Sequence, residues 1–496
     1  MSTELDVAVV GSGPNGLAAA VTMARAGLSV EVFEAQPTIG GGARTLDLGL
    51  APGITNDICS AVHPLAIASP FFVDFDLRAR GLEFTTPEIS YAQPLDGQPA
   101  ALAFHDLATT VDHLGEAGPE WDRFFRPLLD RVDDTIWLSL GDKRSIPPTL
   151  RDVDGIANIV KFGMRLLSQA SPAWNIPLSH ETTQALFTGV GSHAIGPLPG
   201  MGTAATATML ATIAHAGGWP SPIGGSQAIT DELVADLEAH GGRVTADARI
   251  SHVSDMPAAR AYILDTSALN AAQIFSGLLP AHVDRALRAF KHGNAAAKVD
   301  FVLNGPVPWA DPNVARAGTV HLGGTREQMA EAEGDVVAGR MPDHPVCLVS
   351  DPTVFDPSRE VNGLRPLWTY CHVPFDCPID PADYIIRQLE RFAPGFRDTI
   401  VDYRSVPASE MAGHNQNYQG GDIATGIITF YRMLARPRTN WDNYSLGVPG
   451  AYLCSAATPP APGVHGMNGW FAAQRALKHR FGIDETPSLA PETVSR

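Results

Sequence analysis

Three glycines near the start of the sequence have a spacing that suits a phosphate-binding turn. Gly11, Gly13 and Gly16 lie between an apolar run at 7–10 and an Ala-rich segment at 17–25. In a strand–turn–helix unit, the first glycine permits the tight turn and the second lets a pyrophosphate approach the backbone. The third lets the helix pack on the strand. The helix N-terminus then faces the diphosphate with its positive dipole end. This dinucleotide-binding turn is predicted to include Ser12, Pro14 and Asn15 as well.

A carboxylate closes the next predicted strand. An apolar pattern at 30–34 ends on Glu34, 18 residues after Gly16. At this place a carboxylate accepts hydrogen bonds from an adenosine ribose. Ala35 and Gln36 follow, so no arginine stands beside Glu34 to bind a 2′-phosphate. The pattern favours a dinucleotide site that also involves Ala35, over the alternative of a glycine-rich turn with an exposed glutamate.

A second glycine cluster follows at 40–42 and is succeeded by Ala43 and Arg44. Here the sequence resembles the superfamily of FAD-dependent amine oxidases and phytoene desaturases. The resemblance implies FAD, bound without a covalent link. It also implies that Gly41, Gly42 and Ala43 crowd the diphosphate and the flavin, while Arg44 offsets phosphate charge.

Two later segments extend the resemblance. Residues 224–226, with the helical pattern that follows to 242, look like the superfamily's return to the FAD domain, and Ile250 would then lie against the adenine. Residues 453–469 look like its C-terminal flavin motif, in which a helix N-terminus faces the flavin pyrimidine. That placement is sensible because reduction builds negative charge there. The implied cofactor contacts in this motif are Ser455, Val464, His465, Gly466 and Met467.

In detail the chain is most similar to the phytoene dehydrogenase-related branch. The residues that carry this likeness are 57–65, 298–300, 305–309, 321–325, 391–396 and 420–423. The resemblance covers nearly the whole chain, and it specifies FAD and the fold better than the reaction. Residues 455–458 include no acidic side chain of the kind that often holds the ribityl chain in amine oxidases. Carbon–carbon redox chemistry is therefore favoured over amine oxidation.

The elements that must position these residues belong to an α/β protein. With 496 residues the chain exceeds what one core usually serves. We expect a Rossmann-like FAD-binding domain, a parallel sheet with helices, interleaved with a mixed α+β substrate domain. The predicted FAD-binding domain takes 1–75, 222–300 and 440–490, and the substrate domain takes 76–221 and 301–439. Further strands are predicted at 243–245, 249–253 and 261–265, Ser226 is expected to cap a helix, and 203–216 reads as a buried helix.

Composition excludes several kinds of partner. Asp and Glu number 53 against 35 Lys and Arg, a net charge of −18 that repels nucleic acid and disfavours adsorption to anionic lipid by charge alone. The sequence shows no secretion signal, transmembrane stretch or metal-binding motif. Five cysteines without close pairing fit reduced thiols in the cytoplasm. Peripheral membrane contact stays open.

Catalytic candidates are fewer. Lys298 opens an apolar strand pattern and could hold a water at the flavin, as in amine oxidases; the alternative is a lysine at a strand edge, paired with Asp300. His465 could touch the flavin, although histidine is also common at helix starts. His63 and His193 are candidates for lining the substrate cavity, and structural roles are an equal alternative.

The leading functional prediction is an FAD-dependent oxidoreductase that desaturates or oxidises an apolar small molecule by hydride transfer to flavin. Electrons would leave to oxygen or a quinone. No second Gly-x-Gly-x-x-Gly motif occurs, so a separate NAD(P) domain is not expected. The alternatives are a flavin-dependent double-bond isomerase or saturase, and a non-catalytic binding or escort protein on the same fold. The intact Gly11–Gly16 and Glu34 set argues against the escort protein.

Overall fold

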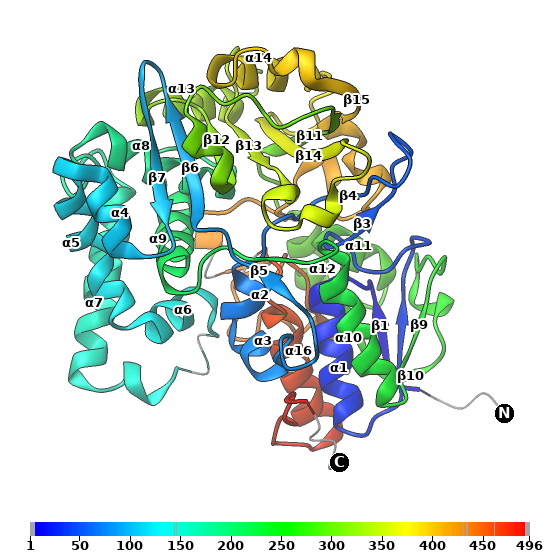
Figure 1. Ribbon diagram of the computed structural model, residues 1–496. Coiled ribbons are helices and arrows are strands. Elements are labelled where there is room, and N and C mark those ends of the chain that lie inside the picture. Colours follow the sequence, from blue (N-terminus) through cyan, green and yellow to red (C-terminus); the bar gives the residue numbers. More distant parts are fainter. Residues whose placement is uncertain are drawn as a thin grey trace, which may run out of the picture.

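The computed structural model describes residues 5–142, 144, 146–429, 431–432, 435–460 and 462–491. Its smaller sheet, at the lower right of Figure 1, has five parallel strands in the order β16-β10-β1-β2-β9. Three separate parts of the sequence supply them, which confirms the Rossmann-like prediction. The strands are β1 (Leu5–Val10), β2 (Val30–Phe33), β9 (Arg243–Thr245), β10 (Ala259–Leu264) and β16 (Ala451–Leu453).

Helices cover both faces of this sheet because successive side chains of a strand alternate between faces. Val7 and Val9 of β1 share a core with helices α1 (Pro14–Arg25), α10 (Gln227–Ala239) and α16 (Met467–Ala476). Ala8 and Val10 share a core on the other side with α11 (Ala268–Ile274) and α12 (Ala281–Arg288). A strand buried on both faces explains the unbroken apolar run at 7–10.

The larger sheet, at the top of Figure 1, has the order β15-β11-β14-β13-β12-β6-β7 and is antiparallel except where β12 pairs with β6. Helix α14 (Ala382–Phe392) packs on one face, and α8 (Glu181–Gly191) with α13 (Arg326–Val337) on the other. This mixed sheet confirms the predicted α+β part. Its strands are β6 (Ile89–Leu95), β7 (Gln98–Phe104), β11 (Ala295–Leu303), β12 (Ala317–Leu322), β13 (Cys347–Ser350), β14 (Arg365–Val373) and β15 (Ile400–Val406).

A group of helices extends to the left in Figure 1. It contains α4 (Leu107–Leu114), α5 (Gly118–Leu129), α6 (Val132–Leu140) and α7 (Val153–Gln169). Of these, α5, α6 and α7 pack on α9 (Met201–Ala216), and α4 packs on α5. Helix α9 confirms the buried helix predicted at 203–216. Among the residues that the structure describes, no helix has both the length and the apolarity needed to cross a membrane. Short elements complete the fold: α2 (Leu65–Ala68), α3 (Pro70–Phe75), β3 (Thr45–Leu46), β4 (Asn56–Asp57), β5 (Phe84–Thr85) and β8 (Ser221–Pro222).

Two local predictions are wrong. Residues 249–253 form no strand, because the Asp255 carboxylate accepts hydrogen bonds from the Ser251 and His252 amides at 2.9 and 2.8 Å, donors that a sheet would need. Ser226 precedes α10, but its side chain makes no capping bond. Its hydroxyl instead donates to the Ser60 carbonyl at 2.6 Å, which ties the helix start to the N-terminal segment.

Candidate functional site

A cavity of about 610 Å³ extends from the carboxyl edge of the parallel sheet to helices α6, α7 and α9. At its first end the wall includes Gly11, Glu34 and Asp265, which directly follow strands β1, β2 and β10, and Ser455, two residues after β16. Ligands of open α/β sheets bind at this edge, outside the carboxyl ends of the strands. The predicted dinucleotide residues are therefore where such a ligand would lie.

The glycines of this end admit no side chain. A Cβ on Gly13 would lie 2.6 Å from the Asp265 carboxylate, and one on Gly41 would lie 2.7 Å from the Gly13 Cα. Gly11 and Gly41 also have φ values of +96° and +57°, in the region that favours glycine. The bare backbone of both loops is thus presented at the cavity wall, as close approach to a diphosphate requires.

Glu34 is held in a fixed position at the end of β2. Its Oε2 accepts hydrogen bonds from the Ser12 amide at 2.9 Å and the Ser12 hydroxyl at 2.6 Å, and its Oε1 accepts one from the Gln36 amide at 2.9 Å. Its side chain lines the cavity, whereas Ser12 lies outside the lining residues. Ser12 is therefore a positioning residue that orients the carboxylate.

Arg44 is the cation of the second glycine cluster. Its guanidinium donates to the Gly41 carbonyl at 2.8 Å, the Thr38 hydroxyl at 2.9 Å and the His414 carbonyl at 2.7 Å. Only 3% of the residue is exposed, and it lines the cavity. Burial lowers the pKa of Arg44, and nearby Glu34 opposes that shift. A buried, fixed guanidinium is suited to phosphate charge.

Most of the cofactor-binding and substrate-lining residues predicted from the sequence line this cavity. Gly16, Gly466 and Met467 lie outside the lining set, as do Ser12, Lys298 and His465. Those that line the cavity are Gly11, Gly13, Pro14, Asn15, Glu34, Ala35, Gly41, Gly42, Ala43, Arg44, His63, His193, Ile250, Ser455 and Val464.

The two predicted catalytic side chains are buried behind the wall. Lys298 forms a short ion pair with Asp300, and its Nζ lies 5.9 Å from the ring centroid of Trp368, which does line the cavity. His465 Nδ1 accepts the Met467 amide at 3.1 Å, a contact at the start of helix α16. Both residues support neighbours of the cavity.

Asp265 is a site residue that sequence reasoning missed. It follows β10, and its Oδ2 accepts the Gly16 amide at 3.0 Å. Burial raises its pKa to about 7; the Gly16 bond opposes this shift, and the charge of Glu34 adds to it. The sequence does hold one indication that Asp265 belongs to the site, because it ends a predicted strand as Glu34 does. What the sequence could not provide is the pairing of β10 with β1, which brings Asp265 beside the glycine loop.

Four buried polar atoms on the cavity wall have no hydrogen-bond partner among the described residues: Asn15 Oδ1, His63 Nδ1, His414 Nδ1 and Thr425 Oγ1. Such atoms cost free energy unless a ligand or water satisfies them. Together with the bare glycine backbone, the fixed carboxylate of Glu34 and the buried cation of Arg44, they fit a large polar dinucleotide. The residues present at this end of the cavity thus fit FAD.

The opposite end of the cavity is apolar and aromatic. Its polar lining residues include His193, whose Nε2 lies 2.9 Å from Nε2 of buried His321. Burial lowers the pKa of His193 to about 3, and His372 adds to the shift. Both rings of the pair are therefore neutral near pH 7, with one donating to the other. The apolar and aromatic lining includes Leu138, Leu140, Phe162, Leu166, Met201, Met209, Leu210, Trp219, Trp368, Tyr370, Ile423 and Ile428.

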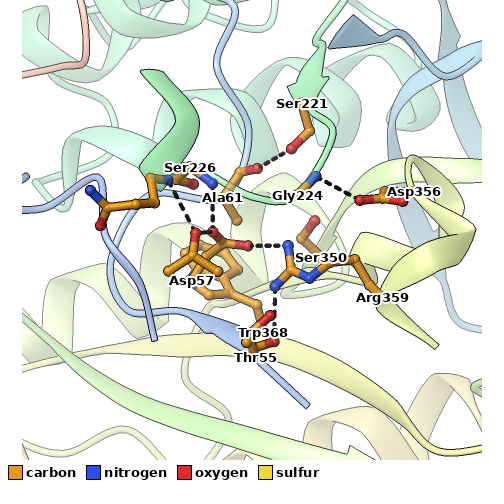
Figure 2. Close-up of polar contacts among 12 residues, drawn as sticks. Thr55, Asp57, Ala61, Ser221, Gly224, Ser226, Ser350, Asp356, Arg359 and Trp368 are labelled. Carbon is orange, nitrogen blue, oxygen red and sulfur yellow. Dashed lines mark hydrogen bonds and ion pairs between the residues drawn. The ribbon is translucent and has the colours of Figure 1, made fainter. Parts of the chain in front are cut away.

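A buried polar network joins the two halves of the molecule beside the cavity (Figure 2). Asp57 accepts the Arg359 guanidinium at 3.1 Å and the Ser226 amide at 2.8 Å. Arg359 also donates to the Thr55 carbonyl at 2.9 Å. Burial raises the pKa of Asp57, but Arg359 and the hydrogen bonds outweigh it and hold that pKa below its usual value. His63 Nε2 lies 2.8 Å from the Ser226 hydroxyl, so the network also supports the cavity wall.

The fold and this site define a two-part, dinucleotide-binding protein, and comparison with known proteins agrees. Residues 9–67 match the model of the NAD(P)-binding Rossmann-like domain. The chain is 21% identical to pyridine nucleotide-disulfide oxidoreductase domain-containing protein 2 of Rattus norvegicus, over 95% of this chain and 93% of that protein. It is 25% identical to an uncharacterized protein of Mycobacterium tuberculosis, over 73% and 72% of the two chains.

Solved structures resemble the whole chain. A putrescine oxidase superposes with a TM-score of 0.57 at 18% identity, over 95% of this chain and 98% of its own. Cyclohexylamine oxidase from Brevibacterium oxydans gives 0.54 at 16% identity, over 96% and 98%. These likenesses confirm the predicted fold class. The matched Rossmann-like domain supports a dinucleotide cofactor at the carboxyl edge of the parallel sheet. The likenesses do not extend to the phytoene desaturase branch, which stays a prediction.

Proposed function

We propose that this protein is an FAD-dependent oxidoreductase that desaturates or oxidises an apolar organic substrate. The observation that carries the proposal is the continuity of the cavity, whose dinucleotide end and apolar end form one space. When bound, FAD accepts a hydride from a substrate C–H bond and passes two electrons on to oxygen or a quinone.

The chain's own residues bind and orient the reactants. The backbone of Gly11–Gly16 and the guanidinium of Arg44 hold the diphosphate, and Glu34 accepts the ribose hydroxyls. At the other end the apolar side chains exclude water from the reacting bond. His193, neutral and held by His321, is a polar group there that can orient a substrate by a hydrogen bond.

The motifs shared with the phytoene dehydrogenase-related branch favour carbon–carbon desaturation among the possible reactions. The test is anaerobic mixing of the purified flavoprotein with a panel of apolar metabolites. Bleaching of the flavin absorbance, with a product lighter by two hydrogens, is the expected result. Turnover without a mass change would assign an isomerase, and a gain of two hydrogens with reduced flavin would assign a saturase. A colourless protein that takes up no FAD contradicts the proposal.

A further inference from the structure

Helix α7 carries apolar side chains on two opposite faces. Phe162 and Leu166 point inward and line the apolar end of the cavity. On the outward face Val153, Ile156, Val160, Met164 and Leu167 recur every three or four residues, and they are 84, 54, 59, 61 and 53% exposed. A surface helix normally presents polar side chains outward. A contiguous exposed apolar stripe of this kind marks a surface that another body covers.

Further exposed apolar residues lie near the two ends of the helix. Ile146 precedes it with 42% exposure, and Ile176 follows it with 79% exposure. Figure 1 shows α7 at the outer left edge of the molecule, away from the parallel sheet. We call the outward residues of α7, with Ile146 and Ile176, the apolar stripe.

The charges around the apolar stripe are opposite in balance to those of the whole chain. From 144 to 176 the sequence has four basic residues against two acidic ones, whereas the full chain has 35 against 53. One of the two acidic side chains, Asp152, accepts the Gly155 amide at 2.7 Å and caps the helix. Of the basic residues, Arg144 lies 3.6 Å from Asp442 and Arg165 donates to the Phe124 carbonyl at 3.2 Å, whereas Arg151 and Lys161 are exposed.

We propose that the apolar stripe docks on the surface of an anionic lipid bilayer. Apolar side chains flanked by lysine and arginine are the composition that binds this interface, since long basic side chains reach the headgroups while apolar ones enter the acyl boundary. A second copy of the chain fits less well, because two identical basic faces would repel each other. The strongly acidic remainder of the protein favours presenting this face to an anionic surface.

The docking places α7 between lipid and the apolar end of the cavity. An apolar substrate dissolved in the bilayer would then reach the cavity past a single helix, without crossing water. This second step rests on the proposed function; the docking itself does not.

The test uses the purified full-length protein with its cofactor and vesicles of phosphatidylcholine and phosphatidylglycerol. We expect the parent to float with the vesicles and the double variant Val160→Asp/Met164→Glu to lose at least about tenfold in bound fraction. The matched control is Val337→Glu on α13, where the parent side chain is 53% exposed; it should bind as the parent does. Flavin content and melting temperature should be unchanged in both variants.

Changing the charge of the protein or of the vesicles tests the electrostatic part of the binding. Lys161→Glu and vesicles of phosphatidylcholine alone should each weaken binding. Failure of the parent to bind, or equal binding by the parent and the double variant, overturns the proposal. So does a parent that is dimeric by light scattering and becomes monomeric in the double variant without any vesicle binding, because a second copy then covers the stripe. Vesicle binding by a protein that takes up no FAD would contradict the proposed function and leave the docking intact.

Discussion

The two ends of the cavity are built in different ways. At the dinucleotide end, Gly11, Glu34 and Asp265 directly follow strands of one parallel sheet, and hydrogen bonds fix Glu34 and Arg44. At the apolar end, the lining comes from helices α6, α7 and α9 and from strand β14, which packing alone brings together. Chemistry that depends on backbone geometry is therefore concentrated at the first end, and substrate selection at the second.

Of the substitutions that test this difference between the two ends, Glu34→Arg should have the largest effect, on FAD binding. Glu34→Arg replaces the ribose acceptor with a cation and removes the partner of Ser12, so charge-assisted hydrogen bonds worth about 1.5–3 kcal/mol each are lost. We expect no detectable FAD in the variant, measured as the ratio of flavin to protein absorbance. The control Glu331→Arg, at an exposed position of α13, should keep its flavin. Unchanged occupancy in Glu34→Arg would refute the role of this carboxylate.

The buried ion pair between Asp57 and Arg359, which joins the two halves, should contribute to the free energy of unfolding. Arg359→Met leaves the buried Asp57 carboxylate without its cation, and loss of one partner of a buried pair costs about 3–5 kcal/mol. Denaturant unfolding should show that loss. Arg397→Met is the matched control, since Arg397 and its partner Asp383 are 59 and 75% exposed and such pairs contribute about 0–1 kcal/mol. Equal effects of the two substitutions would show that the network of Figure 2 does not hold the halves together.

Asp265 should make the folding stability of the apoprotein depend on pH. Because burial raises its pKa to about 7, the folded apoprotein keeps a proton that the unfolded chain releases near pH 4. Folding stability therefore falls as the pH rises through this window. Asp265→Asn removes the effect, so the variant should exceed the parent by roughly 1–4 kcal/mol at about pH 8 and match it below about pH 4.

Thermal unfolding of the two apoproteins across this pH range measures the difference. A constant difference at all pH values would mean that Asp265 does not titrate in this window.

The smallest expected effect concerns Lys298. Its pairing with Asp300 behind the wall predicts a supporting role, so Lys298→Met should change the rate of flavin reoxidation less than about threefold, under ~0.7 kcal/mol. Stability should fall in this variant, and the double variant Lys298→Met/Asp300→Asn should recover part of it, because no unpaired charge is left buried. Stopped-flow reoxidation decides the matter. A rate at least tenfold slower, about 1.4 kcal/mol, would place Lys298 at the flavin.

Sequence reasoning reached the dinucleotide end because its signals are local. Gly11, Gly13, Gly16 and Glu34 lie within one strand–turn–helix–strand unit, where spacing alone implies position. The contact of His193 with His321 joins residues 128 apart, the first in the 3-10 turn Ser192–Ala194 after α8 and the second on β12, and no local pattern could reveal it. The apolar stripe was missed for a related reason, since only the packed structure decides which face of α7 other helices cover.

The FAD content of the purified protein is the decisive measurement, because the dinucleotide end is expected to bind FAD beside an apolar chamber. The purified protein should be yellow and should release FAD on denaturation, in a near-equimolar amount and without a covalent link, as measured by chromatography of the supernatant. A colourless preparation that stays colourless after incubation with FAD would contradict this expectation.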